Sequence, residues 1–379
     1  MKPAKTIGIL GGGQLAQLIT LAAKPLGLKV IVIDTSPDCP AAQVGAEEII
    51  AKSGNDQSAL NELAKRSDVI TVEFEELFDV SMLKSIVATG KPVYPLPATI
   101  ELIKDKLTQK EFLRKNNIAV GPFAEITSQD QAEELLAKYS GKMVIKTRLG
   151  GYDGNGNAVV QNVQDIAAAF QKFLGRPLYA EAFVPFTKEL AVMIACGLNG
   201  EPAVYPIVET RQERNICTEV LAPAQISGEE SKKAESLALQ VAEHLGSAGV
   251  YGIEMFLTED GEVLLNEIAP RVHNSGHYTI EACVTSQFEQ HIRAITGMPL
   301  GKTDMKVPAA VMINILGERN GRVELKGTDD VAIIPDTHLH IYGKSPTKID
   351  RKMGHITVTG KDVQTALERA RKARKLLSV

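Results

Sequence analysis

The segment VYGIEMFLTEDGEVLLNEIAPRVHNSGH, residues 250–277, constrains the fold more than any other part of the sequence. Two apolar-rich runs flank Asp260-Gly261, a pair of residues that favours a two-residue hairpin turn. Counting outward from that turn places Glu254 directly opposite Glu267. Like charges that face each other on one side of a sheet destabilise it. This hairpin therefore needs something to offset two negative charges.

A cation between the two strands would offset those charges. Mg²⁺ binds oxygen ligands and is typically held by one or two carboxylates together with substrate phosphates. The sequence therefore predicts a metal–nucleotide site on the hairpin, and a solvated hairpin with both glutamates in water is the alternative. A polar cluster after the hairpin favours the site: Arg271, His273, Asn274, Ser275 and His277.

Composition and charge narrow the class of protein. The 379 residues are 44% hydrophobic and 23% charged, which suits a globular chain of two or three domains. The net charge is -4 and Lys and Arg form no basic stripe, so no nucleic-acid partner is expected. No run of about 18 apolar residues suggests a membrane span. The four cysteines form no CxxC pair, which disfavours zinc and disulfides and fits a reducing cytoplasm.

Three domains are expected along the chain, combining α/β and α+β architecture. Residues 1–100 alternate strand and helix patterns, which indicates a Rossmann-like domain with a parallel sheet, and the proline-rich VYPLPAT marks its end. Residues 101–298 mix both patterns, and LIKDKLTQKEFLRKN predicts one strong helix. Residues 299–379 predict a small β-rich domain with strands in AAVMINIL, AIIPDTHLHIYG and HITVTG, closed by a helix.

A glycine turn follows the first predicted strand, TIGIL. Gly11, Gly13 and Ala16 match the G-x-G-x-x-G/A pattern, and Asp34 ends the next strand. Such a turn lets backbone N–H groups at a helix N-terminus approach a phosphate. Any phosphorylated small molecule would satisfy it, and a tight turn with no ligand is the alternative.

A second glycine-rich loop runs from Lys146 to Asn157, between two predicted strands. A strand, a glycine loop and a second strand can form a flap that folds over a triphosphate, and Lys146 at the strand end can neutralise phosphate charge. A long β-hairpin without a nucleotide is the alternative. The lysine just before a series of glycines favours the flap.

Taken in order, these features resemble the ATP-grasp superfamily. The stretches TVEFE, DKLTQK, GGYDGNG, NEIAPRVHNSGH and RKMGH resemble one family closely, the 5-(carboxyamino)imidazole ribonucleotide synthases of purine biosynthesis, and the resemblance spans the whole chain. It implies a Rossmann-like domain, an ATP-grasp domain over residues 101–298 with a flap subdomain at about 118–182, and a small C-terminal domain.

The resemblance also implies a reaction. ATP and bicarbonate carboxylate the exocyclic amine of 5-aminoimidazole ribonucleotide, and ADP and phosphate are released. Bicarbonate first takes the γ-phosphate to give carboxyphosphate, and this breaks down to CO₂, which the amine captures. Mg²⁺ (or Mn²⁺) is the implied metal, and a cytoplasmic homodimer is expected.

The resemblance assigns the nucleotide and metal contacts residue by residue. Lys106 and Lys146 are expected on the ATP phosphates, with Glu189 on the ribose and Gln212 near the nucleotide. The flap that covers the phosphates would comprise Gly151, Tyr152, Asp153, Gly154, Gly156 and Asn157. The hinge that binds adenine would comprise Glu181, Ala182, Phe183 and Val184. The metal ligands would be Glu254 and Glu267 with Asn266, although strict alternation puts Asn266 on the opposite face of its strand from Glu267.

The ribonucleotide and bicarbonate contacts are assigned in the same way. The phosphate end of the ribonucleotide would meet the glycine turn at Gly12, Gly13, Gln14 and Leu15. Lys344 and Arg351 would complete that clamp, because a planar guanidinium binds phosphate bidentately. Glu73 and Tyr152 would address the imidazole and its amine. The bicarbonate and carboxyphosphate would be held by Arg271, His273 and Asn274, with His273 able to move a proton.

The sequence departs from the family pattern at three places and leaves other readings open. Gln212 stands where many members carry histidine, Lys106 where some carry arginine, and KID precedes Arg351 where RPG is usual. Other readings are an ATP-grasp ligase for a different carboxylate such as formate, a nucleotide-dependent dehydrogenase built on the glycine turn, and a ligase-like binding module. For His355, a role in the site and a purely structural role are both left open.

Overall fold

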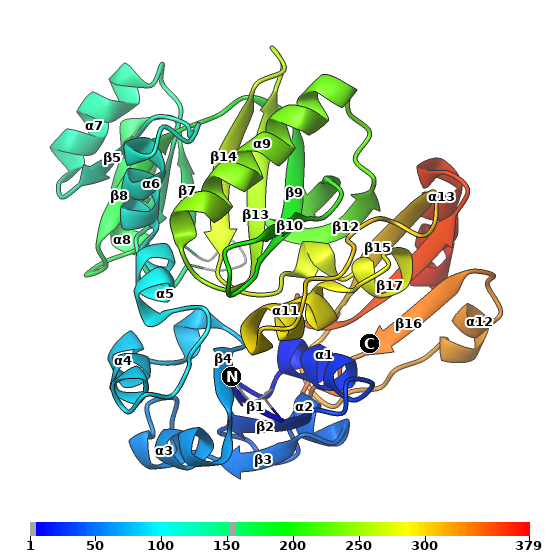
Figure 1. Ribbon diagram of the computed structural model, residues 1–379. Helices are drawn as coiled ribbons and strands as arrows, with labels where there is room; N and C mark the ends of the chain where they lie inside the picture. Colours follow the sequence, from blue (N-terminus) through cyan, green and yellow to red (C-terminus); the bar gives the residue numbers. More distant parts are fainter. Residues whose placement is uncertain (1–4, 152–155) are drawn as a thin grey trace.

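A computed structural model describes residues 5–151 and 156–379. Tyr152, Asp153 and Gly154, which were expected in the flap, lie outside the described residues. Within the described part of the chain, the strands form three sheets (Figure 1). Along the same residues, no helix combines the length and apolar character needed to cross a membrane.

The N-terminal sheet is parallel in the order β3-β2-β1-β4, as the alternating pattern predicts. Its strands are β1 (Thr6–Leu10), β2 (Lys29–Asp34), β3 (Glu47–Ile50) and β4 (Val69–Val72). The accompanying helices are α1 (Gln14–Ala23), α2 (Pro40–Gln43), α3 (Gln57–Arg66), η1 (Glu75–Leu77) and α4 (Val80–Ala88). Strands β1 and β4 are apolar and almost entirely buried, as expected for a parallel sheet covered by helices, whereas the edge strand β3 is largely exposed.

The flap lobe contains an antiparallel sheet in the order β5-β8-β6-β7, seen at the upper left of Figure 1. Its elements are β5 (Phe123–Ile126), α7 (Gln129–Lys138), β6 (Met143–Thr147), β7 (Asn157–Val160), α8 (Val163–Lys172) and β8 (Leu178–Ala182). Lys146 pairs with Asn157 where β6 and β7 meet the glycine loop. The strand, loop and strand arrangement expected of a flap is therefore confirmed.

The largest sheet joins the central and C-terminal parts of the chain. Its strands follow the order β14-β13-β9-β11-β12-β15-β17-β16, and β10 pairs with β9. They are β9 (Phe186–Cys196), β10 (Pro202–Val204), β11 (Val208–Glu213), β12 (Ile216–Ala222), β13 (Gly249–Thr258), β14 (Val263–Ala269), β15 (Ala309–Leu316), β16 (Thr337–Ile341) and β17 (Lys352–Gly360). Because β12 pairs with β15, the sheet continues across residue 299, and the three domain boundaries remain predictions.

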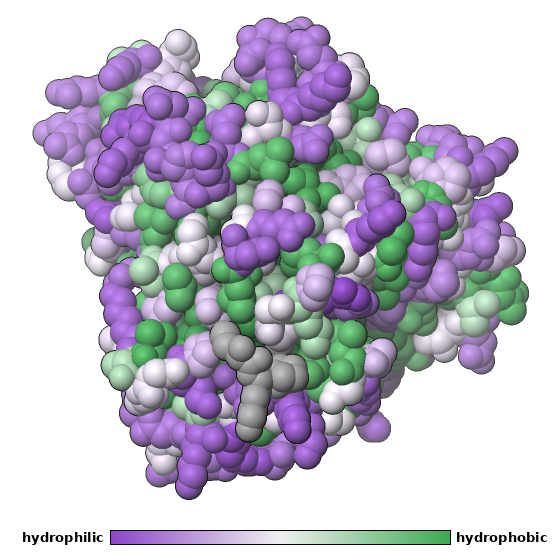
Figure 2. Space-filling view, viewed as in Figure 1, coloured by the Kyte–Doolittle hydropathy of each residue, from purple (hydrophilic) through white to green (hydrophobic). Residues whose placement is uncertain are grey.

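The remaining helices cover this sheet and link it to the N-terminal sheet. They are α5 (Pro97–Lys104), α6 (Lys106–Lys115), α9 (Gly228–Leu245), η2 (Asn274–Gly276), α10 (Thr279–Ala282), α11 (Gln287–Thr296), α12 (Thr328–Ala332) and α13 (Val363–Leu376). In Figure 1, α11 lies between the large sheet and α1. The apolar residues Phe288, Ile292 and Ile295 of α11 are buried in the core cluster that includes α1. Figure 2 shows hydrophilic residues over the outer lobes and hydrophobic residues in scattered patches across the middle of this face.

Two secondary-structure predictions are wrong in detail. The single helix expected in LIKDKLTQKEFLRKN is two, because the side chain of Asp105 accepts hydrogen bonds from the backbone of Leu107 and Thr108 and starts a new helix there. The strand expected in AIIPDTHLHIYG covers Thr337–Ile341, whereas the apolar start of that segment follows α12.

The predicted hairpin turn is also wrong, but the predicted facing of its glutamates is confirmed. Leu257 pairs with Val263 and the backbone N–H of Thr258 donates to the carbonyl of Glu262 at 2.9 Å, so the loop is longer than two residues. A bulge between Leu265 and Glu267 then shifts the register back and places Glu254 opposite Glu267. The longer loop and the bulge each shift the strand pairing by one residue, in opposite directions, so the predicted pairing is restored.

His291 of α11 connects two sheets. Its Nδ1 accepts a hydrogen bond from the backbone of Val250 on β13 at 3.1 Å, and its Nε2 lies 2.8 Å from the hydroxyl of Thr71 on β4. Both bonds suit a neutral imidazole that accepts at Nδ1 and donates at Nε2. Burial lowers the pKa of His291 to about 4, below the 6.5 of a free histidine.

We expect the His291→Gln variant to lose stability less steeply than the wild type as the pH falls from 6.5 to 4. In that range the unfolded chain binds a proton at His291 that the folded chain does not, so acid favours unfolding by up to about 1.4 kcal/mol per pH unit. Urea unfolding of both chains at several pH values measures the difference. His244→Gln, on the outer face of α9, is the control, and identical slopes for all chains would contradict the assignment.

Candidate active site

The paired carboxylates lie beside a lysine from a different element. Glu267 Oε2 is 2.9 Å from Nζ of Lys106, the first residue of α6. Burial, followed by repulsion from Glu267 and Glu189, raises the pKa of Glu254 to about 7. Burial acts on Glu267 in the same direction, but the attraction of Lys106 outweighs it and the pKa is lowered. The two facing carboxylates therefore repel each other, and a cation bound between them would reduce that repulsion.

The donor set fits Mg²⁺ bound together with a nucleotide. Among residues 5–151 and 156–379, no cluster of three or more His, Cys, Asp or Glu residues could hold a metal unaided. Two facing carboxylates that need phosphate oxygens to complete the coordination are typical for this ion. The bulge also affects Asn266, whose Oδ1 lies 3.4 Å from Nζ of Lys146. Because the strand does not alternate strictly here, Asn266 reaches the lysines on the side of the site.

Glu181 is the centre of a buried charge network. Its carboxylate lies 3.0 Å from Nζ of Lys146 and 3.4 Å from Nζ of Lys110, and the hydroxyl of Tyr179 donates to it at 2.7 Å. Burial raises the pKa of Glu181, but Lys110 and Lys146 outweigh it and lower the value to about 2. The side chain of Glu181 is thus committed to the lysines, and its backbone lies in β8 between β5 and β6, so the expected contact with adenine remains a prediction.

Lys110 was missed in the sequence. It is 2% exposed, and its Nζ donates to the carbonyl of Leu265 at 3.3 Å. Burial lowers its pKa, although Glu181 opposes this effect. The signal was present in DKLTQK: Lys106 and Lys110 are four residues apart and therefore share one face of a helix.

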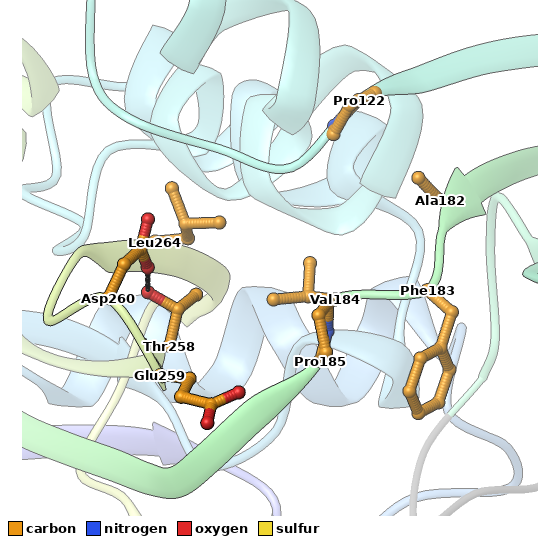
Figure 3. A pocket seen from close by; sticks show the side chains of 9 residues that line it. All are labelled: Pro122, Ala182, Phe183, Val184, Pro185, Thr258, Glu259, Asp260 and Leu264. Carbon is orange, nitrogen blue, oxygen red and sulfur yellow. Dashed lines mark hydrogen bonds between the residues drawn. The ribbon is translucent and has the colours of Figure 1, made fainter. Parts of the chain in front are cut away.

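The predicted adenine hinge borders a pocket of about 670 Å³ (Figure 3). In the figure the hinge lies on one side and the end of the β13-β14 hairpin on the other. The lining residues are Pro122, Ala182, Phe183, Val184, Pro185, Thr258, Glu259, Asp260 and Leu264. These walls include three of the four predicted hinge residues and are mostly apolar, which suits a base. They do not include Lys106 or Lys146, the two lysines expected on the phosphates.

Glu189 and Gln212, expected near the ribose, lie on the neighbouring strands β9 and β11. Burial raises the pKa of Glu189, and a hydrogen bond with Gln212 partly opposes that rise. The structure thus brings the two residues together, as the assignment requires.

The N-terminus of α1 binds a carboxylate of the chain itself. Glu73, which follows β4, accepts hydrogen bonds from the backbone of Gly13 at 2.6 Å and of Leu15 at 3.0 Å. Gly12 donates to Asp34 at 3.1 Å. Three of the four N–H groups expected to hold the ribonucleotide phosphate are therefore engaged, and their contact with phosphate remains a prediction. A Cβ at Gly13 would lie 2.4 Å from Glu73, so a larger residue does not fit.

Lys344 meets this turn from the C-terminal region. Its Nζ donates to Oε1 of Gln14 and, at 2.9 Å, to the carbonyl of Lys352. The two predicted phosphate contacts are thus brought together although 330 residues separate them. Arg351 donates to the carbonyl of Pro346 at 2.5 Å in the loop between β16 and β17, and its place on the phosphate remains a prediction.

The segment after β14 brings together the residues expected to hold bicarbonate. Arg271 lies 2.7 Å from Glu75, an acidic partner that the sequence did not reveal. Nδ1 of His273 lies 2.9 Å from the hydroxyl of Ser275 and 3.4 Å from its backbone nitrogen, and Nε2 lies 3.7 Å from Oε1 of Glu254. Burial, helped by Arg271, lowers the pKa of His273 to about 3, so the ring is neutral.

The structure also shows the hydrogen-bond partners of Asn274, His355 and His340. The amides of Asn274 and Asn314 on β15 exchange two hydrogen bonds, of 2.9 Å and 2.6 Å. His355 is fully buried, with Nδ1 2.8 Å from the hydroxyl of Tyr342, and this environment fits the scaffold. His340 lies 2.7 Å from Glu281.

Family comparisons agree with this geometry along the chain. Residues 4–104 match the ribonucleotide synthetase preATP-grasp domain, residues 111–288 the ATP-grasp domain, and residues 310–369 the phosphoribosylaminoimidazole carboxylase C-terminal domain. The expected fold is confirmed by these matches.

Curated relatives carry two names. The N5-carboxyaminoimidazole ribonucleotide synthase of Bacillus subtilis is 39% identical over 94% of this chain and 91% of its own. The phosphoribosylaminoimidazole carboxylase of Ogataea methanolica is 45% identical over 95% of this chain but 67% of its own. The chain spans about two thirds of the length of the yeast carboxylases that it matches.

Solved structures agree over nearly the full length. N5-carboxyaminoimidazole ribonucleotide synthetase from Thermotoga maritima is 45% identical with a TM-score of 0.89, covering 99% of each chain. N5-carboxyaminoimidazole synthase from Aspergillus clavatus, in complex with ADP and 5-aminoimidazole ribonucleotide, is 34% identical with a TM-score of 0.91 over 99% of each chain. These matches argue against the alternative in which the glycine turn belongs to a dehydrogenase. The chain belongs to the N5-carboxyaminoimidazole ribonucleotide synthase family of ATP-grasp ligases.

Proposed function

We propose that the chain uses ATP and bicarbonate to carboxylate the exocyclic amine of 5-aminoimidazole ribonucleotide, releasing ADP and phosphate. The observation that supports this most directly is the facing pair Glu254 and Glu267 beside Lys106, with Arg271, His273 and Asn274 on the adjoining segment. The fold of a relative that holds ADP and the aminoimidazole ribonucleotide matches the whole chain. Mg²⁺ (or Mn²⁺), a homodimer and a cytoplasmic location belong to the same proposal.

In this proposal the nucleotide binds between the flap lobe and the β13-β14 hairpin. Lys106 and Lys146 neutralise the phosphates and the flap excludes water above them. Glu254, Glu267 and Asn266 would hold the metal ion, and the chemistry it would supply is to offset the phosphate charge in phosphoryl transfer. Lys110 and Glu181 keep Lys146 in place, because a buried ion pair that loses one member leaves an uncompensated charge.

The acceptor side of the reaction lies at the segment after β14. Arg271 would attract the bicarbonate anion, and the neutral His273 has its Nε2 at 3.7 Å from Oε1 of Glu254. On the ribonucleotide, Gln14 and Lys344 would bind the phosphate end. Glu73 stays close to the amine because α1 holds its carboxylate. The amine would then meet CO₂ as carboxyphosphate breaks down.

Phosphate release is expected to require Mg-ATP, bicarbonate and 5-aminoimidazole ribonucleotide together, because the site assembles charges for all of them. A coupled phosphate assay with each component omitted in turn measures this. Formate in place of bicarbonate is the control for the alternative ligase. Full turnover with formate and none with bicarbonate would contradict the proposal.

The Glu267→Gln variant is expected to lose ATP turnover by at least about 10²-fold while its fold is retained, because a charged ligand to the metal is removed. Glu262→Gln is the matched control: it changes an exposed glutamate just before the same strand, paired with Lys233 at 2.7 Å. Steady-state phosphate release and thermal melting are measured for both. Wild-type turnover in Glu267→Gln would contradict the metal assignment.

A further inference from the structure

A buried glutamine grips the main chain of His273. Gln287, the first residue of α11, has no exposed surface. Its Oε1 accepts a hydrogen bond from the N–H of His273 at 2.9 Å, and its Nε2 donates to the carbonyl of His273 at 2.8 Å. The same Nε2 donates to Nδ1 of His277 at 3.1 Å. The amide therefore makes the two main-chain hydrogen bonds with His273 that a residue of a neighbouring strand would make. His273 itself belongs to no strand.

Close packing leaves this arrangement little freedom. A Cβ at Gly276 would lie 2.5 Å from Oε1 of Gln287, and a Cβ at Gly252 would lie 2.5 Å from Cβ of His273. Both glycines thus make room, one for the glutamine amide and one for the histidine. The main chain of His273 is held by Gln287, and its side chain lies against Gly252 of β13. The hydroxyl of Ser275, 2.9 Å from Nδ1, also holds the imidazole in this position.

The neighbouring residue is held independently. Asn274 exchanges two amide hydrogen bonds with Asn314 of β15, and Asn314 also donates to the carbonyl of Cys217 at 2.9 Å. Loss of the Gln287 amide would therefore release His273 while Asn274 stays anchored. A change at Gln287 therefore acts on His273, one predicted contact of the anion, and leaves Asn274, the other, in place.

We propose that Gln287 is a positioning residue for the anion end of the site. Its amide fixes the backbone of His273 so that the imidazole faces both Glu254 and the bicarbonate bound beside Arg271. This inference rests on the proposed function, since it concerns the same anion. A misplacement of about 1 Å at such a group costs on the order of 10²-fold in rate.

Gln290 provides a matched control on the same helix. It is also fully buried, and its amide grips the main chain of Gly301 in the same way, with two bonds of 2.8 Å. Gly301 lies away from the site residues. Gln287→Met and Gln290→Met each remove one buried amide and keep a similar volume, so the two variants share the structural cost.

The experiment measures kcat and KM for bicarbonate, ATP and the ribonucleotide, with thermal melting, for the wild type and both variants. We expect kcat/KM for bicarbonate to fall on the order of 10²-fold in Gln287→Met. We expect KM for ATP to stay within about twofold, because the lysine network does not include Gln287. Gln290→Met is expected to lose thermal stability to a similar degree with wild-type kinetics.

Equal kinetics in the two variants would overturn the inference, and so would a rise in the KM for ATP well beyond about twofold in Gln287→Met, which a merely structural role would give. If Gln287→Met does not fold, Gln287→Asn gives the same readout, because it keeps the amide but withdraws it by one bond of about 1.5 Å. A wild type that releases phosphate without any dependence on bicarbonate would overturn the proposed function first.

Discussion

The repulsion between Glu254 and Glu267 is the constraint around which the site is arranged. Lys106 pairs with Glu267, and Lys110 and Lys146 pair with Glu181 close by. Each of these lysines therefore pairs with a carboxylate, whereas burial and repulsion from Glu267 raise the pKa of Glu254. A metal ion would offset the negative charge of the two glutamates, and the phosphates of its nucleotide would offset the positive charge of the lysines. The charges of the site are thus arranged in advance for phosphoryl transfer.

Local folding decides where those lysines point. Asp105 ends one helix and caps the next, so that Lys106 begins α6 facing the hairpin. Arg148, which follows β6, binds Asp105 at 2.6 Å and ties the flap lobe to the same helix start. The cation that neutralises Glu267 and the strand that carries Lys146 are therefore positioned by one acidic cap. A charged side chain at a helix start performs both a structural and an electrostatic task.

Much of this was readable in the sequence, because strand alternation, glycine turns and acidic pairs are local patterns. The facing of Glu254 and Glu267 was predicted by counting, yet it holds because a longer loop and a bulge compensate each other. Neither feature has a reliable local signal. The partners that lie far apart in sequence were also missed: Glu75 on Arg271, and Glu73 on the turn at Gly13. These contacts depend on how separate elements pack, which periodicity does not encode.

The C-terminal region contributes to the site because its strands continue the large sheet. The pairing of β12 with β15 carries Asn314 to Asn274, and the loop after β16 carries Lys344 to Gln14. An unpaired buried amide costs more than a typical hydrogen bond gains, so the Asn274–Asn314 pair holds the two regions in one relative position. Contacts expected at the anion end and at the ribonucleotide phosphate thus share one rigid sheet. Strand pairing, rather than a hinge, therefore sets the distance between Asn274, expected at the bicarbonate, and Lys344, expected at the ribonucleotide phosphate.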